Sequence, residues 1–287
     1  MILAKQKLDN MFMINKINPT TERIFNQTKA LWKSFTNEDT QLGSFDSDFL
    51  KKFPILDIAD TTRSTIAIYN YSEFFPEYIT ENVQEILGFS KEEYLSQGSK
   101  LLFSCLDSSH SDFPLTTSKC MEAVFKNLEL NRALNRESNK ESNILATCCG
   151  LKFNHAEKGA IRLLIQQYFI ETHDNQLPIR VISTIQDVTH FMKGDSYCFR
   201  VIYGKEHQFT AIYHSDDNKN LQQNDIISNR EKEILQLIAQ GKDTDNIAEM
   251  LFISRNTVNN HRQNMIDKFS VKDTTALVEL AKICHII

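Results

Sequence analysis

The chain has 287 residues, of which 41% are hydrophobic and 24% are charged, and its formal net charge at pH 7 is −5. This length and composition predict a globular protein of two domains, with a small third piece, that can bury its own cores. The negative balance excludes a protein that coats nucleic acid over its whole surface, so any contact with DNA must be local.

No segment indicates export or membrane insertion. Residues 1–17 lack a continuous apolar run followed by a small-residue cleavage site, and no stretch approaches the ~20 apolar residues of a membrane span. The six cysteines include no Cys-x-x-Cys pair, and the histidine spacing offers no zinc site. We therefore expect a cytoplasmic protein with reduced thiols, without metal, cofactor or membrane contact.

The first 60 residues are predicted to be a helical segment. A helix is expected from Pro19, where Thr20 or Thr21 can cap it, and a second short helix from Asp48 toward Ile58. Residues 1–18 show no regular pattern.

Residues 61–215 are predicted to form one domain around an antiparallel sheet. Two short helices are expected after the first two strands, the first capped by Asn82 with Glu85 and ended by Gly88, the second opened by a capping box of Ser90 with Glu93. The predicted strands are 65–70, the edge-like 73–80 with Pro76, 143–153, 160–172, 178–188, and a hairpin of 197–203 and 208–214. A long helix is expected over 115–128, and a loop over 131–142.

The order of two strands, short helices, a long helix and three strands resembles a PAS domain. The stretch Asn-Val-x-x-Ile-Leu-Gly-Phe-Ser-x-Glu-Glu, within residues 78–95, resembles the PAS signature, and Gln-Asp-Val-Thr at 186–189 resembles its usual ending. The resemblance covers residues 63–190. It implies a sensor domain with an apolar core and an unknown ligand, or a domain that serves only dimerisation.

Other sensors fit the sequence less well. A phosphorylated receiver needs alternating strands and helices, which the helix and three strands of 115–188 do not provide. A homoserine-lactone pocket rich in Trp is disfavoured because the one tryptophan, Trp32, lies outside this region. A flavin adduct needs an Asn-Cys-Arg context, but Cys105 stands in Phe-Ser-Cys-Leu. Haem needs a histidine near the long helix, and His110 precedes it and is expected at the surface or in a turn.

After a polar linker at 216–225, residues 226–287 are predicted to hold four short helices. Ser228 with Glu231 forms a capping box, Gly241 ends the first helix, and Asp243, Ser254 and Asp273 cap the next three. Two helices joined by a tight connection have the geometry of a helix-turn-helix, whose second helix enters the major groove of DNA.

This module resembles the LuxR/FixJ/NarL type of DNA-binding domain. The resemblance rests on Ser-Asn-Arg-Glu-Lys-Glu-Ile-Leu, Ile-Ala-Glu-Met-Leu-Phe-Ile-Ser and Asn-Thr-Val-x-Asn-His-Arg-x-Asn, and it runs from Ile227 to about Cys284. The sequence departs from the family at Asn246, where Glu is usual, and at Asp245, where Lys is common and would meet a phosphate. Ser270 stands in place of the usual Gly, and the loss of Gly from a left-handed position costs about 1 kcal/mol.

The third helix, 254–269, separates an apolar face from a face rich in amides. At 100° per residue, Met265 and Phe269 lie within about 20° of Val258 and define the buried face. Four residues lie roughly 100–200° away on the outer face: Asn256, Asn259, Asn260 and Gln263. Asparagine is a poor helix former, and Lys or Glu would serve solvation better, so the surplus of Asn favours a binding role.

Amide side chains of this kind pair bidentately with adenine N6 and N7. By the resemblance, Asn259, Asn260 and Gln263 are expected to contact bases, and Arg255, Thr257 and Arg262 to meet phosphates. The charge of this module does not favour DNA binding, because residues 225–287 hold eight Lys and Arg and nine Asp and Glu. We therefore expect few phosphate contacts per subunit and a weak dependence on salt.

Together these features predict a DNA-binding transcriptional regulator, not an enzyme, of the α+β class: N-terminal helices, an antiparallel-sheet sensor and a four-helix DNA-binding domain. The expected partners are double-stranded operator DNA and a second copy of the chain, with RNA polymerase as a further candidate. The alternative is a protein-interaction module that keeps the helix-turn-helix fold without binding DNA.

Overall fold

The structure is a computed structural model, and it describes residues 19–33, 63–70, 73, 75–133, 144–172, 178–203, 209–214 and 226–287. The predicted helix from Asp48 and the linker 216–225 lie outside these residues. Within the described part, no helix is both long enough and apolar enough to cross a membrane.

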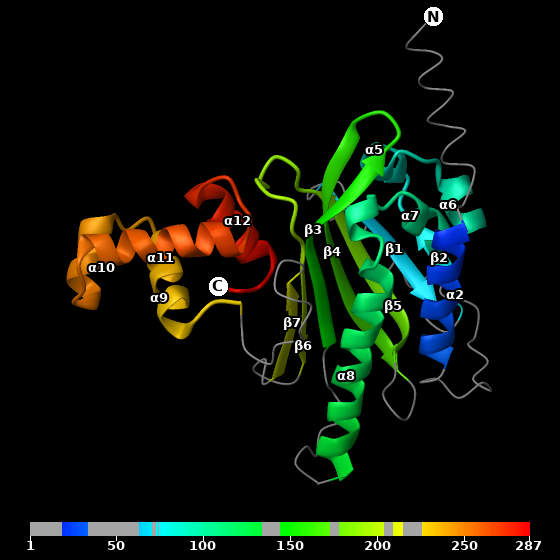
Figure 1. Cartoon of the computed structure of the whole chain (residues 1–287), viewed down its shortest axis with the longest axis horizontal. Helices are drawn as coiled ribbons and strands as arrows, with labels where there is room; N and C mark the ends of the chain where they lie inside the picture. The colour runs from blue at the N-terminus through cyan, green and yellow to red at the C-terminus, as the bar shows by residue number, and fades with distance from the viewer. Residues whose placement is uncertain are drawn as a thin grey trace, which may run out of the picture.

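In the described residues, one antiparallel sheet of seven strands lies at the centre of the molecule (Figure 1). Its order is β2-β1-β5-β4-β3-β6-β7. The strands are β1 (Thr65–Asn70), β2 (Phe75–Ile79), β3 (Ile144–His155), β4 (Gly159–Thr172), β5 (Pro178–Asp187), β6 (Cys198–Tyr203) and β7 (Phe209–His214). β2, which contains Pro76, lies at one edge of the sheet, the usual place for a strand with a proline.

Helices cover one face of this sheet (Figure 1). They are α2 (Pro19–Lys33), α5 (Val83–Leu87), α6 (Lys91–Gln97), α7 (Ser99–Ser104), the 3₁₀ turn η1 (Ser108–His110) and α8 (Phe113–Ala133). The core between them and the sheet includes Ile79, Leu101, Phe153, Leu163 and Val181, all nearly or completely buried.

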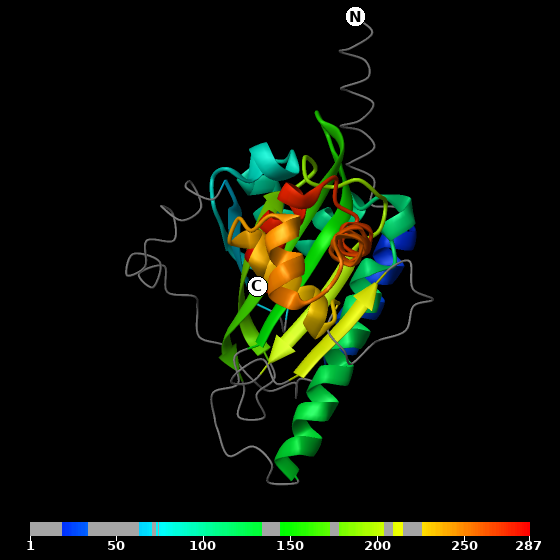
Figure 2. The ribbon, with the colours of Figure 1, turned by 90° about the vertical axis from the view of Figure 1, so that its left-hand side faces the viewer.

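The four C-terminal helices pack on the opposite face of the sheet, as the two views agree (Figures 1 and 2). They are α9 (Asn229–Ala239), α10 (Thr244–Leu251), α11 (Arg255–Lys268) and α12 (Thr274–Ile283). Because side chains alternate along a strand, Leu163 of β4 enters the first core while its neighbour Leu164 joins the core of the four helices. Val188 and Met192, which follow β5, join that second core as well.

The sheet also caps the end of α12. A helix leaves its last carbonyl groups without partners inside the helix. Gln166 of β4 donates from Nε2 to the carbonyl of Ile283 at 2.9 Å, and Arg200 of β6 donates from Nη1 to the carbonyl of Cys284 at 3.3 Å. The four-helix unit is therefore fixed to the sheet by specific polar contacts as well as by apolar packing.

Most predicted elements are present at their predicted places, including all seven strands and the Ser90–Glu93 capping box. Three expectations need correction. The long helix begins at Phe113 and runs to Ala133, so it occupies the start of the predicted loop. α7 was not predicted. Its N-cap is a glycine, Gly98, without a side-chain cap, so the usual start signal is missing.

The third correction concerns Asn82, which does not cap α5 with its side chain. Its Nδ2 donates to the carbonyl of Ser64 at 2.9 Å, and its Oδ1 accepts from the hydroxyls of Thr80 at 2.7 Å and Thr65 at 3.2 Å. Asn82 therefore joins the start of β1 to the end of β2. The predicted end of α5 is right, since Gly88 adopts the left-handed conformation at φ 85°.

Candidate nucleic-acid interface

Helix α11 is set in place by its cap and by its buried side. The Ser254 hydroxyl accepts from the amide of Thr257 at 3.0 Å, as predicted for an N-cap. Val258 and Met265 are completely buried and Phe269 is nearly so, which confirms the predicted inner face. Ile266 joins them in the core shared with α9, α10 and α12.

The outer face of α11 is open to solvent. Asn256, Asn259, Asn260 and Gln263 are all exposed. Gln263 Nε2 donates to Asp267 Oδ1 at 3.0 Å, one turn further along the helix. The structure thus leaves all four predicted amides accessible on the outer side of α11. Both donors and acceptors are available there for the edge of a base.

The three residues expected to meet phosphates are already engaged within the module. Arg255 Nε lies 2.5 Å from Asp245 Oδ1 of α10. Arg262 donates from Nη2 to the Thr244 hydroxyl at 3.2 Å, and the hydroxyl of Thr257 lies 2.8 Å from that of Ser254. Arg262 is therefore held against α10, while Thr257 serves the cap of its own helix.

The ion pair of Asp245 with Arg255 leads to a test of the weak electrostatics. We expect Asp245→Asn to raise affinity for random duplex DNA and to steepen the slope of log K against log salt by about one unit, because Arg255 is freed for a phosphate. Titrations of labelled DNA at several salt concentrations measure both. Glu249→Gln, which removes the same charge from an exposed site on α10, is the control. Equal effects from the two variants would contradict a specific role for the pair.

A second ion pair ties α11 to α9. Lys268 Nζ lies 2.8 Å from both carboxylate oxygens of Glu231, whose side chain is buried. Glu231 also closes the predicted capping box with Ser228. Burial raises the pKa of Glu231, but the hydrogen bonds from Lys268 and Ser228 outweigh it and lower the pKa below the usual value. The C-terminal end of α11 is thereby anchored to α9.

On the other face of the sheet, a cavity of about 80 Å³ lies between the strands and helices α7 and α8. Its walls are mostly apolar and include Phe103, Phe113, Met121, Ile185 and Phe199. Ser99, Gln167 and Ser183 add polar groups. All of its lining residues lie between Tyr69 and Phe199.

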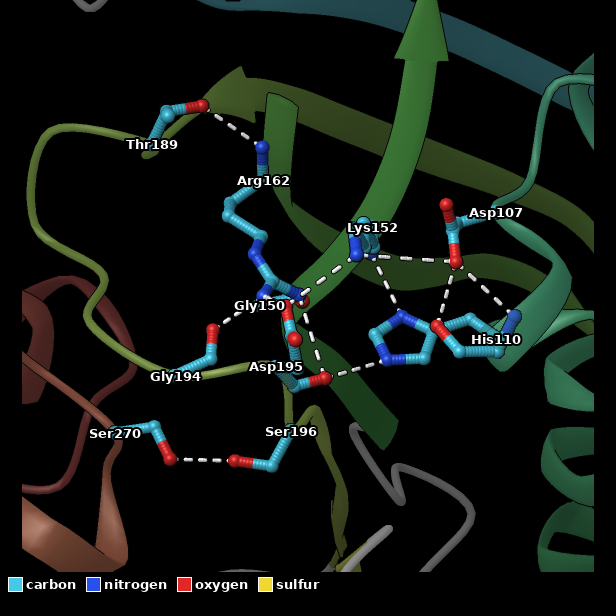
Figure 3. Close-up of polar contacts among 11 residues, drawn as sticks. Asp107, His110, Gly150, Lys152, Arg162, Thr189, Gly194, Asp195, Ser196 and Ser270 are labelled. Atoms are coloured by element: carbon cyan, nitrogen blue, oxygen red, sulfur yellow. Dashed lines mark hydrogen bonds and ion pairs between the residues drawn. The ribbon is translucent and has the colours of Figure 1, made fainter. Parts of the chain in front are cut away.

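Between this cavity and the C-terminal helices runs a polar network on the segment 188–197, which joins β5 to β6 and is called here the connector (Figure 3). Arg162 of β4 donates from Nη1 to the carbonyl of Gly150 at 3.1 Å and bonds through Nη2 to the carbonyl of Gly194. The same Nη2 lies 2.5 Å from Asp195 Oδ1. A buried guanidinium therefore holds the middle of the connector.

His110 holds the same segment from the other side, which sequence reasoning missed. It lies in a turn, as expected, but it is 2% exposed instead of lying at the surface. Its Nε2 lies 2.7 Å from the carbonyl of Asp195, and its Nδ1 accepts from the amide of Lys152 at 2.8 Å. This pattern requires the neutral ring with its proton on Nε2. No local signal marks such a residue, because its partners are 42 and 85 positions away.

The neutral state of His110 predicts a loss of stability in mild acid. Burial lowers its pKa, Arg162 and Lys152 add to this, and the Asp195 carbonyl and the Asp107 carboxylate oppose it. Since the folded pKa is depressed, the unfolded chain binds a proton first, and stability falls as the pH drops below about 6.5. Urea unfolding from pH 7.5 to 5.5 measures the slope. His110→Gln, which keeps a donor toward Asp195, should reduce this slope. The pKa of buried His155 is also lowered, so its share of the slope should remain in both proteins. A slope that His110→Gln leaves unchanged would contradict the neutral state assigned to His110.

The geometry of α10 and α11, with a capped second helix presenting polar side chains, defines a helix-turn-helix module. Residues 225–281 match the family described as bacterial regulatory proteins, luxR family. The spore germination protein GerE of Bacillus subtilis is 42% identical over 65 residues, which are 22% of this chain and 88% of GerE. The chain therefore belongs to the luxR family of bacterial regulatory proteins.

A longer relative also matches part of the chain. The oxygen regulatory protein NreC of Staphylococcus haemolyticus is 38% identical over 90 residues, 31% of this chain and 42% of NreC. The chain thus spans less than half of that relative. Among solved structures, VqmA of Vibrio cholerae is 12% identical, the match covers 81% of this chain and 87% of that chain, and the TM-score is 0.29.

Proposed function

We propose that the protein is a sequence-specific DNA-binding transcriptional regulator that reads operator DNA with the outer face of α11. The observation that carries this is the exposure of Asn256, Asn259, Asn260 and Gln263 side by side on a capped helix of a luxR-family module. Asn and Gln pair with adenine in the major groove, which admits an α-helix. The N-terminus of α11 also favours a phosphate, to which Arg255 and Arg262 would add charge.

The proposal extends to the assembly on DNA. A helix-turn-helix protein usually meets two half-sites about one helical turn apart as a dimer, and we expect two copies of this chain to do so, with α12 as the dimerisation helix that the resemblance implies. Contact with RNA polymerase is part of the same proposal. We propose that the chain acts by binding and not as an enzyme. We expect it to do so in the cytoplasm.

We propose further that residues 61–215 are a PAS-like sensor, preceded by a helical segment at 1–60 and followed by the linker and the DNA-binding domain at 226–287. The element order of two strands, short helices, a long helix and three strands supports this. The cavity beside Phe113 and Met121 suits a small, mostly apolar ligand with a few hydrogen-bonding groups. Dimerisation without a ligand is the other role of such a domain.

Selection of bound sequences from random duplex DNA by the purified chain tests the proposal. Enrichment of one motif with adenine at defined positions is expected. If no motif emerges, the proposal fails. Failure to bind any DNA at low salt, with tight binding to a protein, would favour the alternative of an interaction module. The observations behind that alternative are the acidic balance of residues 225–287 and the neutralisation of Arg255 by Asp245.

A further inference from the structure

The residue that ends the recognition helix is in an unfavourable conformation. Ser270 follows Phe269, the C-cap of α11, and has φ 50°, in the left-handed region that glycine adopts freely. Its amide donates to the carbonyl of Asp267 at 3.0 Å, and the next amide, of Val271, donates to the carbonyl of Ile266 at 3.1 Å. The turn itself needs only a left-handed residue, so glycine would end this helix at lower cost.

The side chain of Ser270 explains why serine stands there. Its hydroxyl bonds to the hydroxyl of Ser196 in the connector (Figure 3). It also packs closely on Gly194, where an added Cβ would come within 3.3 Å of the Ser270 Oγ. Serine thus gives this turn a polar contact with the sensor that glycine cannot make.

Backbone bonds on either side complete this contact. The amide of Lys193 donates to the carbonyl of Ser270 at 2.8 Å, and the amide of Lys272 donates to the carbonyl of Phe191 at 2.9 Å. Between them Met192 and Val271 form an isolated antiparallel bridge. The end of α11 and the connector therefore pair like two short strands.

The far side of the connector faces the sensor. Asp195 is held by Arg162 and His110, as described above, and the ring of Tyr197 lies 4.8 Å from that of His110 and 5.6 Å from that of Phe113. Phe113 also lines the sensor cavity. One segment thus touches the cavity wall on one side and the end of α11 on the other.

We infer that Ser270 is a positioning residue: with Ser196 and the two backbone pairs it forms a latch between the connector and the end of α11. The latch holds the recognition helix in a fixed position relative to the sensor, so a shift of the cavity wall is passed to α11 through the connector. Ser270 takes the place of glycine to make it. This inference rests on the proposed function, since it assigns a means of regulation to the same DNA-reading helix.

Hydrogen exchange of the full chain, followed by NMR, tests the latch through the amides of Lys193 and Lys272. Ser270→Gly should speed their exchange by about tenfold, the loss expected when a hydrogen bond of ordinary strength is removed from a locally opening contact. Ser196→Ala should speed the exchange of the same two amides, because it removes the other hydroxyl of the contact and leaves Ser270 and its left-handed turn unchanged. The Ser196→Ala, Ser270→Gly double variant should exchange no faster than either single variant, because both substitutions remove the same contact.

Two controls separate the latch from simpler effects. Phe252, at φ 54° and almost fully exposed, is also a left-handed non-glycine residue of the DNA-binding module, so Phe252→Gly relieves similar strain but should leave the two amides unchanged. The amide of Leu235, in the core of the four helices, reports global unfolding and should not exchange faster in any of these variants.

Unchanged exchange in both Ser270→Gly and Ser196→Ala would overturn the latch, and so would additive effects in the double variant. The same proteins are carried through the selection from random DNA. Motif enrichment with unchanged exchange would refute the latch alone, whereas the expected exchange pattern in a chain that selects no motif would refute the proposed function alone.

Discussion

The Asn259→Ala and Asn260→Ala variants are expected to lose discrimination among operator sequences, by about 1–3 kcal/mol for each residue that pairs with a base. Both side chains are exposed on α11, while Val258 beside them is buried, so their removal should leave the fold intact. Alanine is in addition the better helix former. Competition between the selected site and point-substituted sites measures the loss, which should appear at particular base pairs and not uniformly.

Asn264 supplies a matched control for these two variants. It is exposed on the same helix, but at 100° per residue it lies off the face shared by Asn256 and Gln263, about 240° from Val258. Asn264→Ala should leave sequence preference unchanged. If it reduces discrimination as much as Asn259→Ala does, the assignment of the reading face is wrong.

Gly150→Ala is expected to destabilise the protein by about 3 kcal/mol, which combines left-handed strain with overpacking. Gly150 has φ 88° at an irregularity of β3, and an added Cβ would stand 2.8 Å from the carbonyl oxygen of Ser196. Neither backbone can yield easily, since the Gly150 carbonyl accepts from Arg162. Urea unfolding followed by circular dichroism measures the change.

Gly159 separates the two causes. It also has a positive φ, 77°, but an added Cβ there would meet nothing within 4 Å. Gly159→Ala should therefore cost only about 1 kcal/mol, the strain of the backbone alone. Equal losses from the two substitutions would show that the close approach of the connector to Gly150 contributes nothing.

The elements that could be predicted from sequence are those with local causes. The caps at Ser90, Ser228, Asp243, Ser254 and Asp273 each act within three residues, and all five accept the expected bond. The inner face of α11 could be predicted because its apolar residues recur at the helical repeat. The left-handed turn at Ser270 was also predictable, because the residue stands in place of a glycine.

The connector and the docking of the four helices were not predictable in this way. Their contacts join residues that are distant in sequence, such as Gln166 with Ile283 and Ser196 with Ser270. Asn82 shows the same limit on a smaller scale: a side chain suited to a cap was drawn into bonds between two strands. The buried position of His110 likewise depends on groups that only the folded chain brings together.

The central claim is that amides of α11 read adenine, and one measurement addresses it directly. In the site selected from random DNA, single adenines are replaced by 7-deazaadenine, which lacks the N7 acceptor in the major groove. We predict that at least one position weakens binding of the unmodified chain by about tenfold or more and has no effect on the Asn259→Ala or the Asn260→Ala variant. Equal binding of the unmodified chain to every substituted site would contradict the claim.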